Sequence, residues 1–280
     1  NMSVVGIIAE YNPLHCGHEY HIKNVRDLTD AKACVCVLSS NFVQRGEPAL
    51  LSKWARTKMA LVSGADLVIE LPAAFSCGSA EYFSSGAISI LEGLGLVDYL
   101  CFGSETGNIK PLETAAHHLA FESESFKEQL KSRLNDGLSF ATSRQNALEA
   151  TLSDTDTIDI INKPNNILAI EYIKALKRIG SNIKPLTIKR KGQAFNDITP
   201  YNSINQTQNF SSATSIRHYI KQMDDSSLCQ HDSFLLNSIS EPCIKLLCDE
   251  FNLGRGPVFL ESFENTILHL FRTMDNNSIS

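Results

Sequence analysis

Two histidines lie close together near the N-terminus, in the segment Asn-Pro-Leu-His-Cys-Gly-His that ends at His18. His15 and His18 are three residues apart and would share one face of a helix, while Gly17 between them has no Cβ to keep a ligand away from the backbone. The free amide groups and partial positive charge at a helix start bind anions. The pattern predicts a phosphate-binding site, and the alternative is a pair of surface histidines beside a helix cap.

A second candidate is the segment Ser-Ser-Ala-Thr-Ser-Ile-Arg that ends at Arg217. It is typical of a hydroxyl-rich turn that opens a helix. The hydroxyls of Ser212 and Thr214 and the free amides of such a turn could cap the helix or bind phosphate oxygens, and Arg217 could neutralise their charge. Such caps are common, so the segment alone is equally an ordinary helix start. Together with the histidine pair, it favours nucleotide chemistry.

The elements that must position these residues alternate between strand and helix. An apolar run, Val4–Ala9, precedes the histidines, and an amphipathic stretch from Gly17 to about Leu28 follows them. The further expected strands are Ala33–Ser39, Asp66–Leu71, Asp98–Phe102 and Lys184–Arg190, and the further expected helices are Ser52–Ser63, Ala80–Leu94 and Ile167–Leu176. This alternation predicts an α/β fold with a doubly wound parallel sheet. Ligands of such sheets lie beyond the carboxyl ends of the strands, where the histidine segment falls.

The remaining segments are helical in pattern. Residues 111–152 have apolar side chains at spacings of three and four and predict a helical insertion within an α/β domain that spans residues 2–222. Ala213–Met223 predicts a short helix, and Ser233–Met274 is also helical in pattern. We expect residues 223–280 to be a helical segment that starts a C-terminal region continuing beyond this sequence.

The composition narrows the class of protein. The net charge is −6, with 25 Lys and Arg against 31 Asp and Glu, and 43% of the residues are hydrophobic, which excludes disordered and collagen-like chains. The apolar runs fall far short of the ~18 residues that cross a membrane, and no signal segment is visible, so we expect a cytoplasmic protein. The eight cysteines contain no Cys-x-x-Cys pair, and we expect no metal-binding side chains.

The strand, the Asn-Pro-x-His-x-Gly-His segment and the following helix are similar to the HxGH nucleotidyltransferase superfamily, whose members activate a substrate by attack on the α-phosphate of ATP. More narrowly, the chain resembles the bacterial tRNA(Met) cytidine acetate ligase family. The resembling stretches are Gly6–His21, Gln44–Ala49, Ser52–Arg56, Asp66–Pro72, Phe102–Glu105, Lys163–Leu168, Lys189–Arg190 and the Ser/Thr turn. The resemblance implies a Rossmann-like fold that forms acetyl-adenylate from ATP and acetate, then makes N4-acetylcytidine at the wobble position of elongator tRNA(Met).

The resemblance also implies roles for residues. His15, His18 and Arg217 would be catalytic, donating to phosphate oxygens, and Mg²⁺ would be held mainly by the nucleotide and water. The implied nucleotide-binding residues are Ile7, Ile8, Ala9, Glu10, Tyr11, Asn12, Pro13, Leu14, His15, Cys16, Gly17, His18, Glu19, Tyr20, Gly103, Asn165, Asn166, Arg190, Ser212 and Thr214. Without the family, Gly103 is equally an ordinary turn glycine, and the two asparagines equally cap the helix that follows them.

A tRNA partner would have to bind local basic clusters, because the whole chain is acidic. The clusters are Lys53, Arg56 and Lys58, and Lys184, Lys189, Arg190 and Lys191. The first is equally a solvated helix face. Trp54 would offer a base-stacking surface, although a single Trp in an amphipathic helix is more often part of the core. Arg45 would reach acetate or phosphate.

Two other functions stay open at this point. A metabolic adenylyltransferase for a mononucleotide or phosphopantetheine would share both motifs and would not need RNA. A non-catalytic RNA-binding protein would bind ATP unproductively or not at all.

Overall fold

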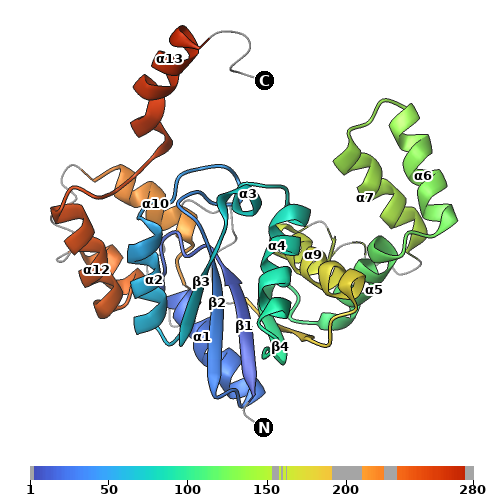
Figure 1. Cartoon of the computed structure of the whole chain (residues 1–280), viewed down its shortest axis with the longest axis horizontal. Coiled ribbons are helices and arrows are strands. Elements are labelled where there is room, and N and C mark those ends of the chain that lie inside the picture. The colour runs from blue at the N-terminus through green and yellow to red at the C-terminus, as the bar shows by residue number, and fades with distance from the viewer. Residues whose placement is uncertain are drawn as a thin grey trace.

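A five-stranded parallel sheet forms the centre of the computed structural model, which describes residues 3–152, 158, 160–161, 163–190, 210–223 and 232–274 (Figure 1). The strands are β1 (Val4–Ala9), β2 (Ala33–Ser39), β3 (Leu67–Leu71), β4 (Tyr99–Ser104) and β5 (Lys184–Lys189). Their order is β3-β2-β1-β4-β5, and every neighbouring pair is parallel. The doubly wound sheet predicted from the sequence is confirmed, with strand limits that differ by one or two residues.

The strand order reverses between β1 and β4, and the two strands separate there. β1 pairs with β2 along all six of its residues, but its recorded pairs with β4 are only Val5 with Tyr99 and Gly6 with Leu100. The end of β1 therefore diverges from β4. This is where doubly wound sheets open a crevice for ligands.

The structure describes the following helices, most of which cover one of the two faces of the sheet. They are α1 (Cys16–Thr29), α2 (Lys53–Val62), α3 (Ala73–Ser76), α4 (Ala80–Gly93), α5 (Ile109–Ala120), α6 (Glu124–Asn135), α7 (Phe140–Thr151), α9 (Pro164–Ile179), α10 (Ala213–Lys221), α11 (Ser233–Ser238), α12 (Glu241–Asn252), the 3₁₀ turn η2 (Leu260–Phe263) and α13 (Glu264–Thr273). The short α3 was not predicted, and the helical stretch expected up to residue 274 is interrupted by residues 253–259, which include Gly254 and Pro257.

Alternation along the strands builds two separate cores. Cys34 and Cys36 of β2 face a core formed with α1, α2, α10, α11 and α12, whereas Val35 and Val37 face one formed with α4, α5, α7 and α9. Both faces of a parallel sheet must be buried in this way. Helix α5 packs against α9 in the second core, so the part of the predicted insertion that stands apart is the α6–α7 hairpin.

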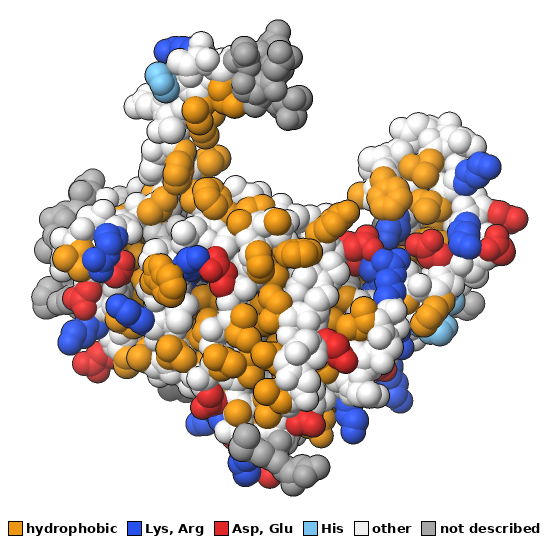
Figure 2. Space-filling view, in the orientation of Figure 1, with side chains coloured by type: hydrophobic (Ala, Val, Ile, Leu, Met, Phe, Trp, Pro, Cys, Tyr) orange, Lys and Arg blue, Asp and Glu red, His pale blue; other side chains and the backbone are white. Residues whose placement is uncertain are grey.

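Two arms extend from the side of the molecule where the strands end, opposite the N-terminus (Figure 1). One is the α6–α7 hairpin and the other is α13, which has no buried residue. Figure 2 shows hydrophobic side chains exposed on both arms, and Phe140 and Phe271 are 59% and 64% exposed. Among the helices that the structure describes, none combines the length and the apolar character needed to cross a membrane.

Candidate active site

The histidine segment folds into a reciprocal cap at the start of α1. His15 is the N-cap residue, and its Nδ1 accepts a hydrogen bond from the main-chain N–H of Gly17 at 3.0 Å. The main-chain N–H of His15 donates to Nδ1 of His18 at 3.3 Å. A Cβ on residue 17 would lie 2.8 Å from Cε1 of His15, so only glycine fits against the His15 ring. The spacing of the motif is thus required by the cap itself.

These contacts fix the protons on both imidazole rings. Since Nδ1 of each ring accepts from a main-chain N–H, the proton of the neutral ring is assigned to Nε2. Burial, assisted by the nearby charge of Arg190, lowers the pKa of His15 to about 3. Burial and the adjacent His15 lower the pKa of His18 well below its usual value. The two rings, with centroids 3.8 Å apart, therefore present neutral Nε2–H donors at neutral pH.

The second motif meets the first. Ser212 caps α10 by accepting from the N–H of Ser215 at 3.0 Å, as the sequence predicted. Arg217, one turn into α10, donates to the main-chain oxygen of Asn12 at 2.7 Å and to Oγ1 of Thr214 at 3.4 Å. Burial lowers the pKa of Arg217. A guanidinium is thereby held against the loop that carries the histidine pair.

Across the crevice, the ends of β4 and β5 place a second arginine. The side chain of Arg190 covers Gly103, and a Cβ on residue 103 would lie 3.0 Å from its Cγ. Nη1 of Arg190 donates to Oδ1 of Asn165 at 2.8 Å. Burial lowers the pKa of Arg190, and the carboxylate of Glu105 opposes this shift. The structure thus brings together Gly103, Asn165 and Arg190, the three residues that the family resemblance assigned to one nucleotide pocket.

The two asparagines have different roles, and neither caps α9. The helix begins at Pro164 with Lys163 as the N-cap residue, so the capping interpretation is wrong. The side chain of Asn166 is fully buried, accepting from the N–H of Glu105 at 3.1 Å and donating to the main-chain oxygen of Ile160 at 2.8 Å. Asn166 holds the backbone, whereas Asn165 contacts the arginine.

The other predicted binding residues between Ile7 and Tyr20 lie at the end of β1, in the loop after it or in α1, and they are buried or half-buried. Ile7 and Leu14 are buried in the core with Tyr11, whose ring stands edge-on to His18 at 5.0 Å. The half-buried Ile8 and Ala9 end β1, and Pro13 is buried in the loop. Tyr20 stacks at 5.6 Å on Phe210, just before α10. Burial raises the pKa of the Cys16 thiol to about 11, so it stays neutral.

Glu10, in the loop after β1, and Glu19, in α1, contact other parts of the protein. Glu10 accepts from the N–H of Gln44 at 2.7 Å, and burial raises its pKa. Glu19 accepts from the hydroxyl of Ser63 at 2.9 Å and from that of Ser240, which ties α1 to the end of α2 and to the start of α12. These carboxylates anchor the loop and α1.

In the first predicted basic cluster, Lys53, Arg56 and Lys58, the arginine does not lie on the surface. Arg56 is fully buried, and its guanidinium donates to main-chain oxygens of Glu10, Ser39 and Leu51. It is a structural residue that holds the loops at the ends of β1 and β2, and the prediction that it meets a partner is wrong. Trp54 is 69% exposed with Lys53 5.3 Å from its ring, so the core interpretation of Trp54 is also wrong. Lys191 and residues 192–209 lie outside the described residues.

Sequence reasoning missed two residues of the crevice. His21 lies one turn beyond His18, and its buried Nε2 has no hydrogen-bond partner in the part of the chain that the structure describes. Burial and Arg190 lower its pKa to about 4. Glu105, which follows β4, contacts Asn165 through its side chain. The repeated three-residue spacing from His15 to His21 was a signal for the first, whereas nothing in the local pattern distinguished Glu105 from a solvent-exposed turn.

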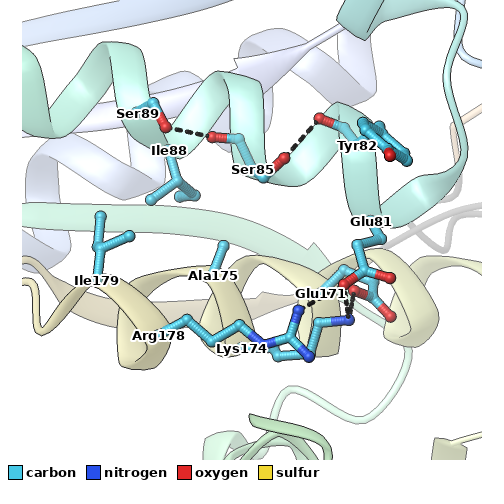
Figure 3. Close-up of a pocket in the computed structure, with 10 residues that line it drawn as sticks. All are labelled: Glu81, Tyr82, Ser85, Ile88, Ser89, Glu171, Lys174, Ala175, Arg178 and Ile179. Atoms are coloured by element: carbon cyan, nitrogen blue, oxygen red, sulfur yellow. Dashed lines mark hydrogen bonds and ion pairs between the residues drawn. The ribbon is translucent and has the colours of Figure 1, made fainter.

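A separate cavity of about 410 Å³ lies between α4 and α9, on the other face of the sheet from α1 (Figure 3). One end is apolar, with Ile88 and Ile179 facing each other. At the other end, buried Lys174 bridges Glu171 at 2.5 Å and Glu81 at 3.1 Å. These charged side chains are paired with one another, and the Lys174–Glu81 pair links α9 to α4.

A parallel sheet that reverses beside β1, a histidine pair capping the next helix and an arginine from a Ser/Thr-capped helix define the nucleotidyltransferase class. The sequence profile of the family described as "HIGH Nucleotidyl Transferase" matches residues 2–280, and the chain belongs to this family.

Known relatives narrow the similarity. The chain is 49% identical over 279 residues to the tRNA(Met) cytidine acetate ligase of Acetivibrio thermocellus, covering 99% of this chain and 65% of that protein. It is 45% identical over 286 residues to the protein of the same name from Halothermothrix orenii, with coverages of 99% and 65%. The chain thus spans slightly less than two thirds of the length of these relatives.

Two crystal structures of Thermotoga maritima TmcAL superpose on the chain, each at 36% sequence identity. The apo form superposes with a TM-score of 0.89, and the matched region includes 98% of this chain and 63% of that protein. The form bound with alpha-thio ATP superposes with a TM-score of 0.86, and the matched region includes 98% of this chain and 62% of that protein.

Proposed function

We propose that this chain activates acetate with ATP and serves to acetylate the wobble cytidine of elongator tRNA(Met). The observation that carries the proposal is the convergence of His15, His18 and Arg217 at the point where the strand order reverses. The relatives named tRNA(Met) cytidine acetate ligase and the TmcAL crystal form bound with alpha-thio ATP support this activity and ATP as the nucleotide. Such an enzyme acts on tRNA in the cytoplasm.

In the first step, a carboxylate oxygen of acetate attacks the α-phosphorus of ATP. A bond forms between that oxygen and phosphorus, the bond to the β-phosphate oxygen breaks, and pyrophosphate leaves. The work of the protein is to align the two reactants and to stabilise charge on phosphate oxygens. The Nε2–H groups of His15 and His18 and the first amides of α1 supply donors, and Arg217 neutralises the leaving pyrophosphate.

In the second step, N4 of the cytidine attacks the acetyl carbon of acetyl-adenylate. The carbon–nitrogen bond of N4-acetylcytidine forms, AMP leaves with the electron pair, and N4 loses one proton. No covalent bond to the protein is needed in either step. Gly103, Asn165 and Arg190 would hold the nucleoside part on the far side of the crevice, because they line the end of β4.

Mg²⁺ would assist by neutralising the phosphates. Within the parts of the chain that the structure describes, His, Cys, Asp and Glu form no group of three that suits a metal ion. Mg²⁺ would be held by the nucleotide phosphates and water, which is its usual coordination in ATP-using enzymes.

The test is an acetate-dependent ATP assay that follows acetyl-AMP and pyrophosphate, with and without elongator tRNA(Met). Acetyl-AMP formed without RNA is the expected result for this chain. The RNA arm compares this chain with the longer relative from Acetivibrio thermocellus as positive control. Binding of ATP with no acetyl-AMP, and adenylyl transfer to nicotinate mononucleotide or phosphopantetheine in its place, would overturn the proposal.

A further inference from the structure

Glu105 is connected to Arg190 through one intermediate residue, Asn165. Its Oε1 accepts from Nδ2 of Asn165 at 2.7 Å and from the main-chain N–H of Asn165 at 3.3 Å. Oδ1 of Asn165 in turn accepts from Nη1 of Arg190 at 2.8 Å. A continuous chain of hydrogen bonds thus joins the carboxylate to the guanidinium.

This chain fixes which way the amide of Asn165 points. An Asn side chain is nearly symmetric in shape, so its orientation is set by its partners. Because Oε1 of Glu105 can only accept, the amide nitrogen must face Glu105, and the amide oxygen must then face Arg190. Without the carboxylate, only the guanidinium of these two partners would hold the amide, and the Asn165 side chain would be free to leave the position in which its oxygen accepts from Arg190.

Glu105 itself is held by the turn after β4. Its main-chain N–H donates to Asn166, which is fully buried. In the same turn, Oγ of Ser104 accepts from the N–H of Gly107 at 2.9 Å and from Oγ1 of Thr187 at 2.7 Å. The carboxylate is therefore a fixed reference on the sheet, from which the position of Arg190 is set.

We propose that Glu105 is a positioning residue, which orients Arg190 through Asn165 toward the crevice beside His15 and His18. The part of this inference that concerns nucleotide binding rests on the proposed function. Among the residues that the structure describes, Oε2 of Glu105 is buried without a hydrogen-bond partner, so replacing it by an amide nitrogen breaks none of the described contacts. Glu105→Gln should therefore keep the relay through its remaining oxygen, whereas Glu105→Ala removes it.

The first test needs no nucleotide. In the ligand-free chain, the side-chain N–H signals of Arg190, assigned with an Arg190→Lys variant, are followed by NMR. They should exchange slowly in the unmutated chain and in Glu105→Gln, and become broad or vanish in Glu105→Ala and in Asn165→Ala. Glu128→Ala, the same change on the exposed face of α6, should leave them unaltered. Unchanged signals in Asn165→Ala would overturn the relay even if Glu105→Ala fails to fold.

The second test is a double-mutant cycle on the Kd for ATP, measured by calorimetry. Glu105→Ala should weaken ATP binding about 10-fold, on the scale of one hydrogen bond to a charged group, and Glu105→Gln less than about 3-fold. In an Arg190→Ala background, Glu105→Ala should add nothing further. An equal loss with and without Arg190 would overturn the inference, because a merely structural residue weakens binding in both backgrounds.

The two tests separate this inference from the proposed function. If the chain binds no ATP while the Arg190 signals respond as expected, the proposed function fails and the positioning role of Glu105 stands. If ATP binds and acetyl-AMP forms, but Glu105→Ala leaves both the signals and the Kd unchanged, the proposed function stands and the inference is wrong.

Discussion

Arg217 donates to the main-chain oxygen of Asn12, 205 residues earlier in the sequence, at 2.7 Å. The contact joins the two motifs that the sequence analysis singled out. It also gives the guanidinium two tasks, since one nitrogen holds the histidine loop while the charge faces the crevice. A lysine has a single ammonium group and cannot perform both tasks in the same geometry.

Arg217→Lys is therefore expected to slow adenylation although it keeps the positive charge. We expect acetate-dependent ATP–pyrophosphate exchange to fall about 10- to 100-fold, in the range of losing one donor to a developing charge. Arg133→Lys, on the exposed face of α6, is the matched control and should exchange at the original rate. A rate for Arg217→Lys equal to that of the control would remove Arg217 from the machinery.

His15 caps α1 and presents a donor, and two substitutions separate these functions. His15→Asn keeps a good cap but lacks the Nε2–H donor, whereas His15→Ala loses both, at a cost of about 1 kcal/mol in stability. Both variants should lower adenylate formation about 10- to 1,000-fold, and so should His18→Ala. Thermal melting and acetyl-AMP yield, measured side by side, check this, with His269→Ala on α13 as control. Full activity in His15→Asn would show that only the cap matters.

Acid should destabilise the protein through its buried histidines. The pKa of His21 is lowered from 6.5 to about 4 by burial, and that of His15 to about 3. As the pH falls below about 6.5, the unfolded chain takes up protons that the folded chain does not bind, so the free energy of unfolding decreases down to about pH 4.

Urea denaturation between pH 7 and pH 4.5 measures this dependence. In His21→Gln, which cannot take up that proton, the free energy of unfolding should fall less steeply with acid. The difference between the two slopes isolates His21, because the other titrating groups are common to both proteins. Parallel curves would show that His21 is protonated equally in the folded and unfolded chains.

Arg56 should be among the residues whose replacement costs the most stability. Its guanidinium makes five hydrogen bonds to the loops after β1 and β2 and to Leu51. Arg56→Met fills a similar volume but leaves buried oxygens unpaired, and we expect a loss of about 3 to 5 kcal/mol by chemical denaturation. The same substitution at exposed Arg133 should change stability by less than about 0.5 kcal/mol. Similar losses at both positions would contradict the structural role of Arg56.

The sequence was sufficient for the sheet, because apolar strands alternating with amphipathic helices leave few other arrangements. It was sufficient for the helix that starts at the histidine pair as well, since the motif is local, but it did not predict the reciprocal cap that His15 and His18 form. It failed where a role depends on distant partners. Nothing near Arg56 shows that three loops will close around it, and nothing near Glu105 shows that Asn165 will fold back onto it. The expected helix cap at Asn165 failed for a local reason, because Pro164 starts the helix one residue earlier.

The two cores described above become complete at different points of the chain. Among the residues that the structure describes, the core that includes α4, α5, α7 and α9 has its last buried member at Ile183, whereas the core that includes α1, α2 and α12 extends to Phe251. Because a ribosome synthesises the chain from the N-terminus, the core with α4, α5, α7 and α9 can form before the last helices of the other core have been synthesised. Val5 and Ile7 of β1 belong to the core that is completed later, so they reach their full burial only after the opposite core can already close.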